Sequence, residues 1–148
     1  IEFQIGLKTD RLVEIMPAPL RLINTAWVYD KMSKTLFTSD MFTYGLSVKP
    51  DDKWVLQKEE QVCDNQFIKS FMLNTRYWWL EGAKTTLLRK NIQRIFDKYD
   101  ITTIAPGYGK LIQGKDLVQK QFIKLDSILS EFDVSKTQAY YISRNHLR

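Results

Sequence analysis

Two short apolar segments, each running into a polar loop, most constrain what this chain can fold into. The first covers residues 35–39 and is followed by Asp40; the second covers 101–104 and is followed by the loop 105–109. β-branched and aromatic residues bounded by turn residues are typical of strands. Functional side chains are common in loops at strand ends. Asp40 has the carboxylate chemistry that a metal bridge needs.

The remaining pattern predicts a single domain in which strands and helices alternate. Both sides of the segment 20–29 carry apolar residues, which indicates a strand covered on both faces. Residues 42–65 show no clear periodicity and are expected to form a long functional or partner-binding loop. The expected elements are strands over 12–16, 20–29, 35–39 and 101–104, the second and third forming a hairpin, two helices between 65 and 99 with a break near Gly82, and a helix over 114–132.

Composition narrows the class of protein. The chain has 148 residues, which fits one domain, and no apolar run approaches the ~18 residues that would cross a bilayer. The net charge of +5 comes from interspersed charges, so we expect a solvated surface and no nucleic-acid partner. Cys63 is the single cysteine and His146 the single histidine, which excludes an internal disulfide and Cys/His zinc spacing. We expect a soluble protein of the cytoplasm or another reducing compartment.

Several segments, in order and spacing, resemble the C-terminal half of a metallo-β-lactamase-fold domain, and within that superfamily the flavodiiron and related diiron oxygen-binding proteins. They are MPAP at 16–19, WVYD at 27–30, KTLFTSDMF at 34–42, RYWW at 76–79 and IAPGYG at 104–109. The resemblance implies an α/β fold, half of an αββα sandwich, in which a mixed sheet has flanking helices. Residues 1–132 are assigned to this half-domain, and 133–148 to a polar, basic tail.

The resemblance also implies a metal site whose ligands have degenerated. Members of the family hold two metal ions, and Asp40 matches their bridging aspartate. Tyr108 stands where the last histidine ligand would be, and Arg21 aligns most nearly with another. A neutral phenol is a poor ligand for zinc or ferrous iron, and a guanidinium brings a permanent positive charge. We therefore hypothesise that an ion pair between Arg21 and Asp40 fills the former metal cleft, with Tyr108 hydrogen-bonding nearby.

Other residues have simpler interpretations. Asp40 taken alone is most often a turn residue at a strand end. The segment 107–110, GYGK, lacks the full phosphate-loop pattern. Aromatic residues at 77–79 could stack on a base or a flavin, but on a helix they usually belong to the core or an interface. We expect neither a nucleophilic Cys63 nor a metal-binding His146.

Two classes of function remain open. In the first, the chain is a non-catalytic, cofactor-free relative of these enzymes that acts as a structural or interaction subunit. In the second, it is part of an active dinuclear iron or zinc hydrolase, or of an oxygen-reducing oxidoreductase, whose other ligands lie upstream or on a partner. Half a sandwich leaves apolar sheet surface wet. We therefore expect a partner beside 20–29 or 35–39: an upstream half of the same domain, another subunit or a second copy.

Overall fold

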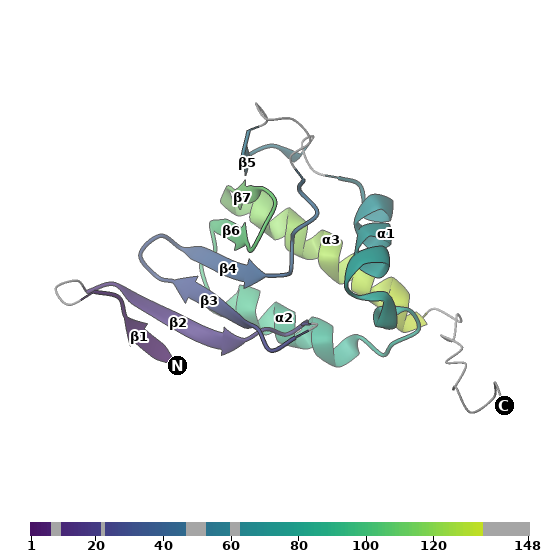
Figure 1. Cartoon of the computed structure of the whole chain (residues 1–148), viewed down its shortest axis with the longest axis horizontal. Helices are drawn as coiled ribbons and strands as arrows, with labels where there is room; N and C mark the ends of the chain where they lie inside the picture. The colour runs from purple at the N-terminus through teal and green to yellow at the C-terminus, as the bar shows by residue number, and fades with distance from the viewer. Residues whose placement is uncertain (7–9, 22, 47–52, 60–62, 135–148) are drawn as a thin grey trace.

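The computed structural model of the chain describes residues 1–6, 10–21, 23–46, 53–59 and 63–134. Within these residues, seven strands form one mixed sheet in the order β1-β2-β3-β4-β6-β7-β5 (Figure 1). The strands are β1 (Glu2–Gln4), β2 (Leu12–Pro17), β3 (Ala26–Asp30), β4 (Thr35–Ser39), β5 (Val55–Leu56), β6 (Thr103–Pro106) and β7 (Leu111–Gln113). The helices are α1 (Asn65–Thr75), the 3-10 turn η2 (Trp78–Leu80), α2 (Thr86–Lys98) and α3 (Lys115–Val134).

The sheet confirms the predicted hairpin and adds three short strands among the described residues. β2, β3 and β4 form an antiparallel meander, in which Val28 pairs with Phe37. β4 then pairs in parallel with β6, because the chain crosses over through α1 and α2 before it returns to the sheet. The short strands β1, β5 and β7 were not expected from the sequence. At two or three residues each they are too short to show a reliable alternation.

The expectation of one long strand over residues 20–29 is wrong in its first half. β3 begins at Ala26, and a loop connects it to β2, closed by a hydrogen bond from the Ala18 amide to the Thr25 carbonyl. Leu20 is buried without belonging to a strand, whereas the side chain of Ile23 is 66% exposed. Apolar residues in this stretch therefore reflect a loop that contributes one side chain to the core, and do not mark a buried strand.

The three predicted helices are present. Asp64 caps the start of α1 by accepting a 2.7 Å hydrogen bond from the amide of Phe67. Among the apolar residues of α1, Ile68 and Met72 are buried, while Phe67 is largely exposed. α3 continues to Val134, and residues 135–148 of the expected tail lie outside the described residues. None of the helices in the described ranges is long and apolar enough to cross a membrane.

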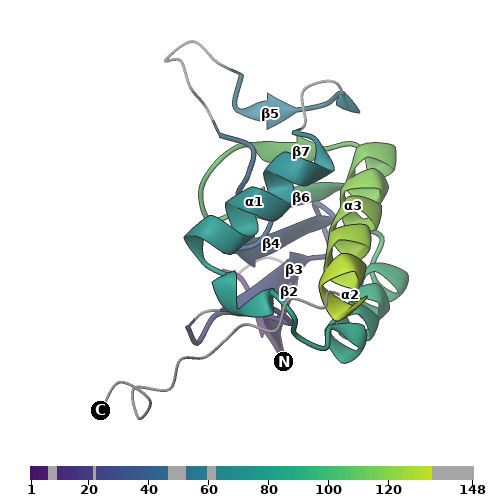
Figure 2. The same ribbon diagram turned by 90° about the vertical axis from the view of Figure 1, so that its right-hand side faces the viewer.

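The two faces of the sheet differ. α2 and α3 lie on one side of it (Figure 2), and strand residues on that side, such as Leu36, Ile104 and Ile112, form the core with them. The opposite side, here called the open face, has no described helix on it. Residues on the open face include Phe3, Phe37 and Leu111, which are 49%, 43% and 38% exposed. The expectation that the segment 20–29 is covered on both faces is therefore wrong for the described residues, because no described helix lies on the open face of β3.

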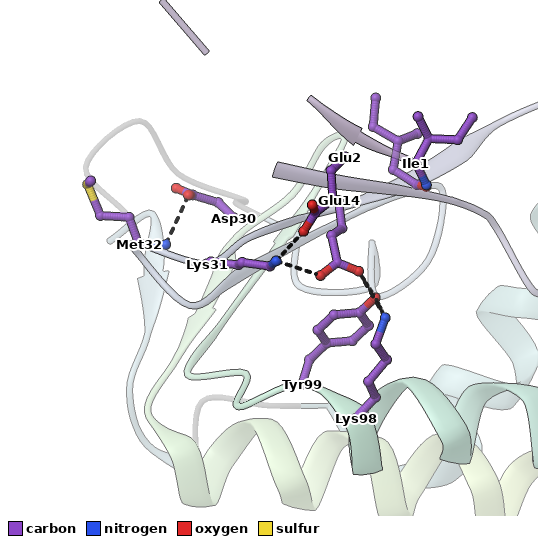
Figure 3. Close-up of polar contacts among 9 residues, drawn as sticks. Ile1, Glu2, Glu14, Asp30, Lys31, Met32, Lys98 and Tyr99 are labelled. Carbon is purple, nitrogen blue, oxygen red and sulfur yellow. Dashed lines mark hydrogen bonds and ion pairs between the residues drawn. The ribbon is translucent and has the colours of Figure 1, made fainter. Parts of the chain in front are cut away.

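A polar cluster closes the N-terminal corner of the sheet, and we call it the Glu14 cluster (Figure 3). It consists of Glu2, Glu14, Lys31, Lys98 and Tyr99. The Glu14 carboxylate accepts a 2.5 Å hydrogen bond from the Tyr99 hydroxyl and lies 2.9 Å and 3.0 Å from the ammonium groups of Lys98 and Lys31. Lys31 also pairs with Glu2. These hydrogen bonds, that of Tyr99 foremost, lower the pKa of Glu14 to about 2.

Candidate functional site

Asp40 lies in a tight turn directly after β4. Two non-glycine residues beside it adopt left-handed backbone conformations, Ser39 with φ 51° and Phe42 with φ 63°. Such conformations cost free energy and often mark functional loops. Thr38 stabilises the turn, because its hydroxyl donates a 2.8 Å hydrogen bond to the Met41 carbonyl and its own carbonyl accepts one from the Met41 amide. The turn therefore holds Asp40 at a fixed place at the end of the sheet.

The loop after β6 packs directly against this turn through its backbone. The Gly107 amide donates a 2.7 Å hydrogen bond to the Ser39 carbonyl, and the Lys110 amide donates one of 2.7 Å to the Gly45 carbonyl. Gly109 has a φ of +86°, and a Cβ atom at this position would lie 2.9 Å from the Gly45 carbonyl oxygen. The contact requires a glycine at 109, and it brings Asp40 and Tyr108 to the same end of the sheet.

An arginine does pair with Asp40, but it is not the one expected. The Arg76 guanidinium donates a 2.9 Å hydrogen bond to Oδ1 of Asp40, and its central carbon lies 4.9 Å from the centre of the Tyr108 ring. The hypothesised partner, Arg21, is exposed, and the described residues include no ion pair between it and Asp40. The predicted ion pair between Arg21 and Asp40 is therefore wrong, because Arg76 is the partner of Asp40. Tyr108 contacts the cation through its ring.

Arg76 reaches this position because α1 ends beside the turn. It is the C-terminal cap of α1, and both its amide and that of Tyr77 donate to the Met72 carbonyl. The helix thus places a guanidinium between Asp40 and the ring of Tyr108. We call these three residues the Asp40 cluster. The RYWW segment belongs to the resemblance, but the sequence does not predict a role for Arg76 at the site, because a contact between residues 76 and 40 leaves no pattern in the sequence.

A small cavity lies behind Asp40, between the turn and α1. It measures about 10 Å³ and is lined by Asp40, Phe42, Met72, Arg76 and Tyr77, among others. This is room for about one water molecule. The Tyr77 hydroxyl is buried and has no hydrogen-bond partner among the described residues. Burial, and then the nearby charge of Asp40, raise the pKa of Tyr77.

The residues of this corner do not fit a dinuclear metal centre. Two divalent ions need several anionic or imidazole donors, whereas Asp40 offers one carboxylate that is already paired with a permanent cation. Across the described parts of the chain, no three His, Cys, Asp or Glu side chains gather in a group that could hold a metal ion. His146 lies outside the described residues. A metal at Asp40 would have to displace Arg76 and take its other ligands from elsewhere.

The other residues considered from the sequence lie away from this cluster or have structural roles. The Cys63 thiol is partly buried and donates a long 3.7 Å contact to the Tyr44 carbonyl, and burial raises its pKa. A raised pKa disfavours the thiolate that a nucleophile needs. Tyr77 belongs to the core, whereas its neighbours Trp78 and Trp79 are exposed.

Comparisons with known proteins identify solved structures that have a similar fold. No family model and no curated protein matches the sequence. Solved structures with a similar fold include the flavodiiron protein from Giardia intestinalis, at 16% identity and a TM-score of 0.51, with 90% of this chain and 28% of that chain covered. Rubredoxin oxygen:oxidoreductase from Desulfovibrio gigas is similar at 13% identity and a TM-score of 0.57, with 82% and 29% covered.

A shorter protein shows the same similarity. The apo state of the chemotaxis sensor ODP from T. denticola matches at 18% identity with a TM-score of 0.52, over 97% of this chain and 52% of that chain. The chain therefore spans between about a quarter and a half of each of these three proteins. At these identities the similarity shows the fold alone. The chain has the architecture of one part of a flavodiiron-like, metallo-β-lactamase-type domain, as the sequence resemblance implied.

Proposed function

We propose that this chain is a non-catalytic, flavodiiron-like half-domain that acts as a structural or interaction subunit. The observation that carries the proposal is the Asp40 cluster. The single carboxylate that matches a metal-bridging ligand is bound to Arg76, and the ring of Tyr108 lies against the same guanidinium. Arginine stays protonated at any physiological pH, so its charge opposes cations at this position.

Metal analysis of the purified full chain tests the first part of this proposal. After incubation with ferrous iron or zinc and removal of excess metal, we expect far less than one ion per chain. An Arg76→Gln variant should bind no more, because one carboxylate is too few donors. Stoichiometric metal that is lost in an Asp40→Ala variant would contradict the proposal.

The open face supports an interaction role. β3 and β4 are interior strands whose edges are both paired, so a partner beside them must contact the face. Phe3, Phe37 and Leu111 expose apolar surface there. Val28 pairs with Phe37 and Ile15 with Val28, so these three apolar residues form one row across the face. Burying such surface stabilises an association by about 25 cal/mol per Å². We propose that a second β-sheet packs on this face, supplied by an upstream half of the same domain or by another subunit, including a second copy.

Two phenylalanines of nearly equal exposure provide a matched test. Phe37 on the open face is 43% exposed, and Phe67 on α1 is 45% exposed. If the open face is an interface, Phe37→Asp should abolish self-association, or binding to a co-expressed upstream half, as measured by light scattering after gel filtration. Phe67→Asp should leave the association intact. A stable monomer that binds no second sheet, with Phe37 unmodified, would contradict the docking role without affecting the metal result.

One observation favours the alternative, in which the chain contributes Asp40 to an active metal centre completed elsewhere. The turn and the loop after β6 keep a strained backbone arrangement, with Ser39 and Phe42 left-handed around Asp40. Strain of this kind is commonly retained at functional sites. Repeating the metal analysis on the chain together with its upstream half separates the two. Binding that appears in this complex and depends on Asp40 would support the alternative.

A further inference from the structure

A basic groove on the helix-covered side of the molecule stands apart from the Asp40 cluster. It has a volume of about 410 Å³ and lies where α2 runs beside α3 (Figure 2). Five of its lining residues come from α2 and one from α3: Thr86, Arg89, Lys90, Gln93, Arg94 and Asp126. Three of these are cations and one is an anion, so the lining carries an excess of positive charge.

The groove holds two cations that no contact in the described residues neutralises. Most described lysines and arginines are paired, as Lys98 is with Glu14 and Lys115 with Asp100. Lys90 and Arg94, by contrast, are exposed and have no hydrogen bond or ion pair to any described residue. They are four residues apart on α2, and like charges at this helical spacing repel each other. The nearby carboxylates of Asp126 and Asp97 are hydrogen-bonded to Arg89 and Gln93, and neither forms an ion pair with Lys90 or Arg94 among the described residues.

Arg89 is fixed in a way that suits ligand binding. Its Nε and one terminal nitrogen each donate a 2.7 Å hydrogen bond to the two carboxylate oxygens of Asp126. This two-point contact holds the guanidinium plane in one orientation. The remaining guanidinium N–H groups are not used by Asp126, and Lys90 and Arg94 lie along the same groove. The arrangement combines one oriented guanidinium with two charges that have no ion-pair partner in the part of the chain that the structure describes.

We propose that this groove binds a small molecule bearing phosphoryl groups. Arginine matches phosphate oxygens in a two-point geometry, and lysine adds a point charge. The volume lies within the range of small-molecule sites. A long nucleic acid fits less well, because the carboxylates of Asp126 and of Asp97, which binds Gln93, interrupt the positive surface. This site is independent of the proposed structural role of the half-domain.

Titration calorimetry on the full chain with inorganic pyrophosphate at low salt tests the site. We expect binding that weakens at least about tenfold in a Lys90→Gln/Arg94→Gln variant, because each charged contact contributes on the order of a tenfold change. Arg21→Gln/Lys53→Gln is the matched control, since it also removes two exposed charges, both outside the groove, and should change affinity less than about twofold. Thermal unfolding without ligand should show that the double variant stays folded, because both side chains are exposed and form no ion pair with a described residue.

Three outcomes would overturn the proposal. One is no detectable binding of pyrophosphate to the native chain. Another is an equal loss of affinity in Arg21→Gln/Lys53→Gln, which would show a general effect of net charge. The third is a single-stranded oligonucleotide that binds more tightly than pyrophosphate and displaces it, which would identify the surface as a nucleic-acid contact.

Discussion

The Asp40 cluster and the Glu14 cluster lie at different parts of the same sheet. They differ in the number of hydrogen bonds to the carboxylate and in the backbone conformation around it. In the Glu14 cluster one carboxylate receives a tyrosine hydroxyl and two lysines, and its backbone lies in regular β2. In the Asp40 cluster one carboxylate receives a single arginine hydrogen bond, left-handed residues flank it, and the Tyr77 hydroxyl nearby has no partner among the described residues.

The Glu14 cluster has features that stabilise the folded state, whereas the Asp40 cluster has features that destabilise it. Multiple hydrogen bonds to one carboxylate stabilise the folded state. Left-handed non-glycine residues and an unpaired buried hydroxyl each lower stability. A site that combines both destabilising features is expected where the loop geometry serves a purpose other than stability. This contrast can be tested by substitutions in or beside both clusters.

Gly109→Ala should have the largest effect, because it attacks the backbone contact between the two loops. The new methyl group would lie 2.9 Å from the Gly45 carbonyl oxygen in a left-handed conformation. We expect a loss of about 4 kcal/mol in the free energy of unfolding. Gly114→Ala is the control: its φ is also positive, but no atom lies within 4 Å of the new group, so about 2 kcal/mol is expected. Chemical denaturation measures the free energy of unfolding of both variants. Equal losses would show that the contact between Gly109 and the Gly45 carbonyl does not limit the size of residue 109.

Glu14→Gln should come next and should depend on pH. The pKa of Glu14 is about 2 in the folded chain, below its ordinary value of 4.5. A lowered pKa adds stability that is complete above pH 4.5 and is lost as the pH falls towards 2. We expect a loss of about 2 kcal/mol at pH 7, allowing for the exposure of both lysines, and almost none near pH 2.

Glu131→Gln is the control for the Glu14 prediction, because Glu131 has one exposed partner, Lys69. The Glu131→Gln substitution should lower the free energy of unfolding by less than about 1 kcal/mol. Thermal unfolding across this pH range measures both variants. A difference between native chain and Glu14→Gln that does not shrink on acidification would rule out the charge of Glu14 as the cause.

Ser39→Gly should have the smallest effect and the opposite sign. Ser39 has a φ of 51°, which glycine adopts without a steric penalty. Relief of this strain, less the greater freedom of glycine in the unfolded chain, should raise the free energy of unfolding by about 0.5 kcal/mol. Ser39→Ala keeps the Cβ atom and should give no gain. Denaturant midpoints distinguish the two, and an increase in both variants would point to the hydroxyl instead of the backbone.

Much of the fold could be predicted because its signals are local. The helix over 114–132 and the hairpin that ends with 35–39 were predicted from the sequence, and both were confirmed. The segment 20–29 failed because apolar residues alone do not distinguish a strand from a loop whose Leu20 enters the core. The two-residue β5 has no usable periodicity.

The site could be predicted only in part. The positions of Asp40 and Tyr108 at neighbouring strand ends follow from the parallel pairing of β4 with β6. The identity of the arginine did not follow, because Arg76 reaches Asp40 through the point at which α1 ends, which depends on tertiary packing. Arg21 was predicted to be the partner because it aligns most nearly with a metal ligand of the family that the chain resembles. Such an alignment does not show in which direction an exposed side chain points.

The parallel pairing of β4 with β6 also sets an order of folding events. The hairpin of β3 and β4 involves near neighbours in sequence, whereas β4 meets β6 only after the segment that forms α1 and α2 has been brought back to the sheet. Contacts of high sequence separation carry a loop-closure cost and form slowly. The loops that carry Asp40 and Tyr108 should accordingly meet late, after the local hairpin has formed.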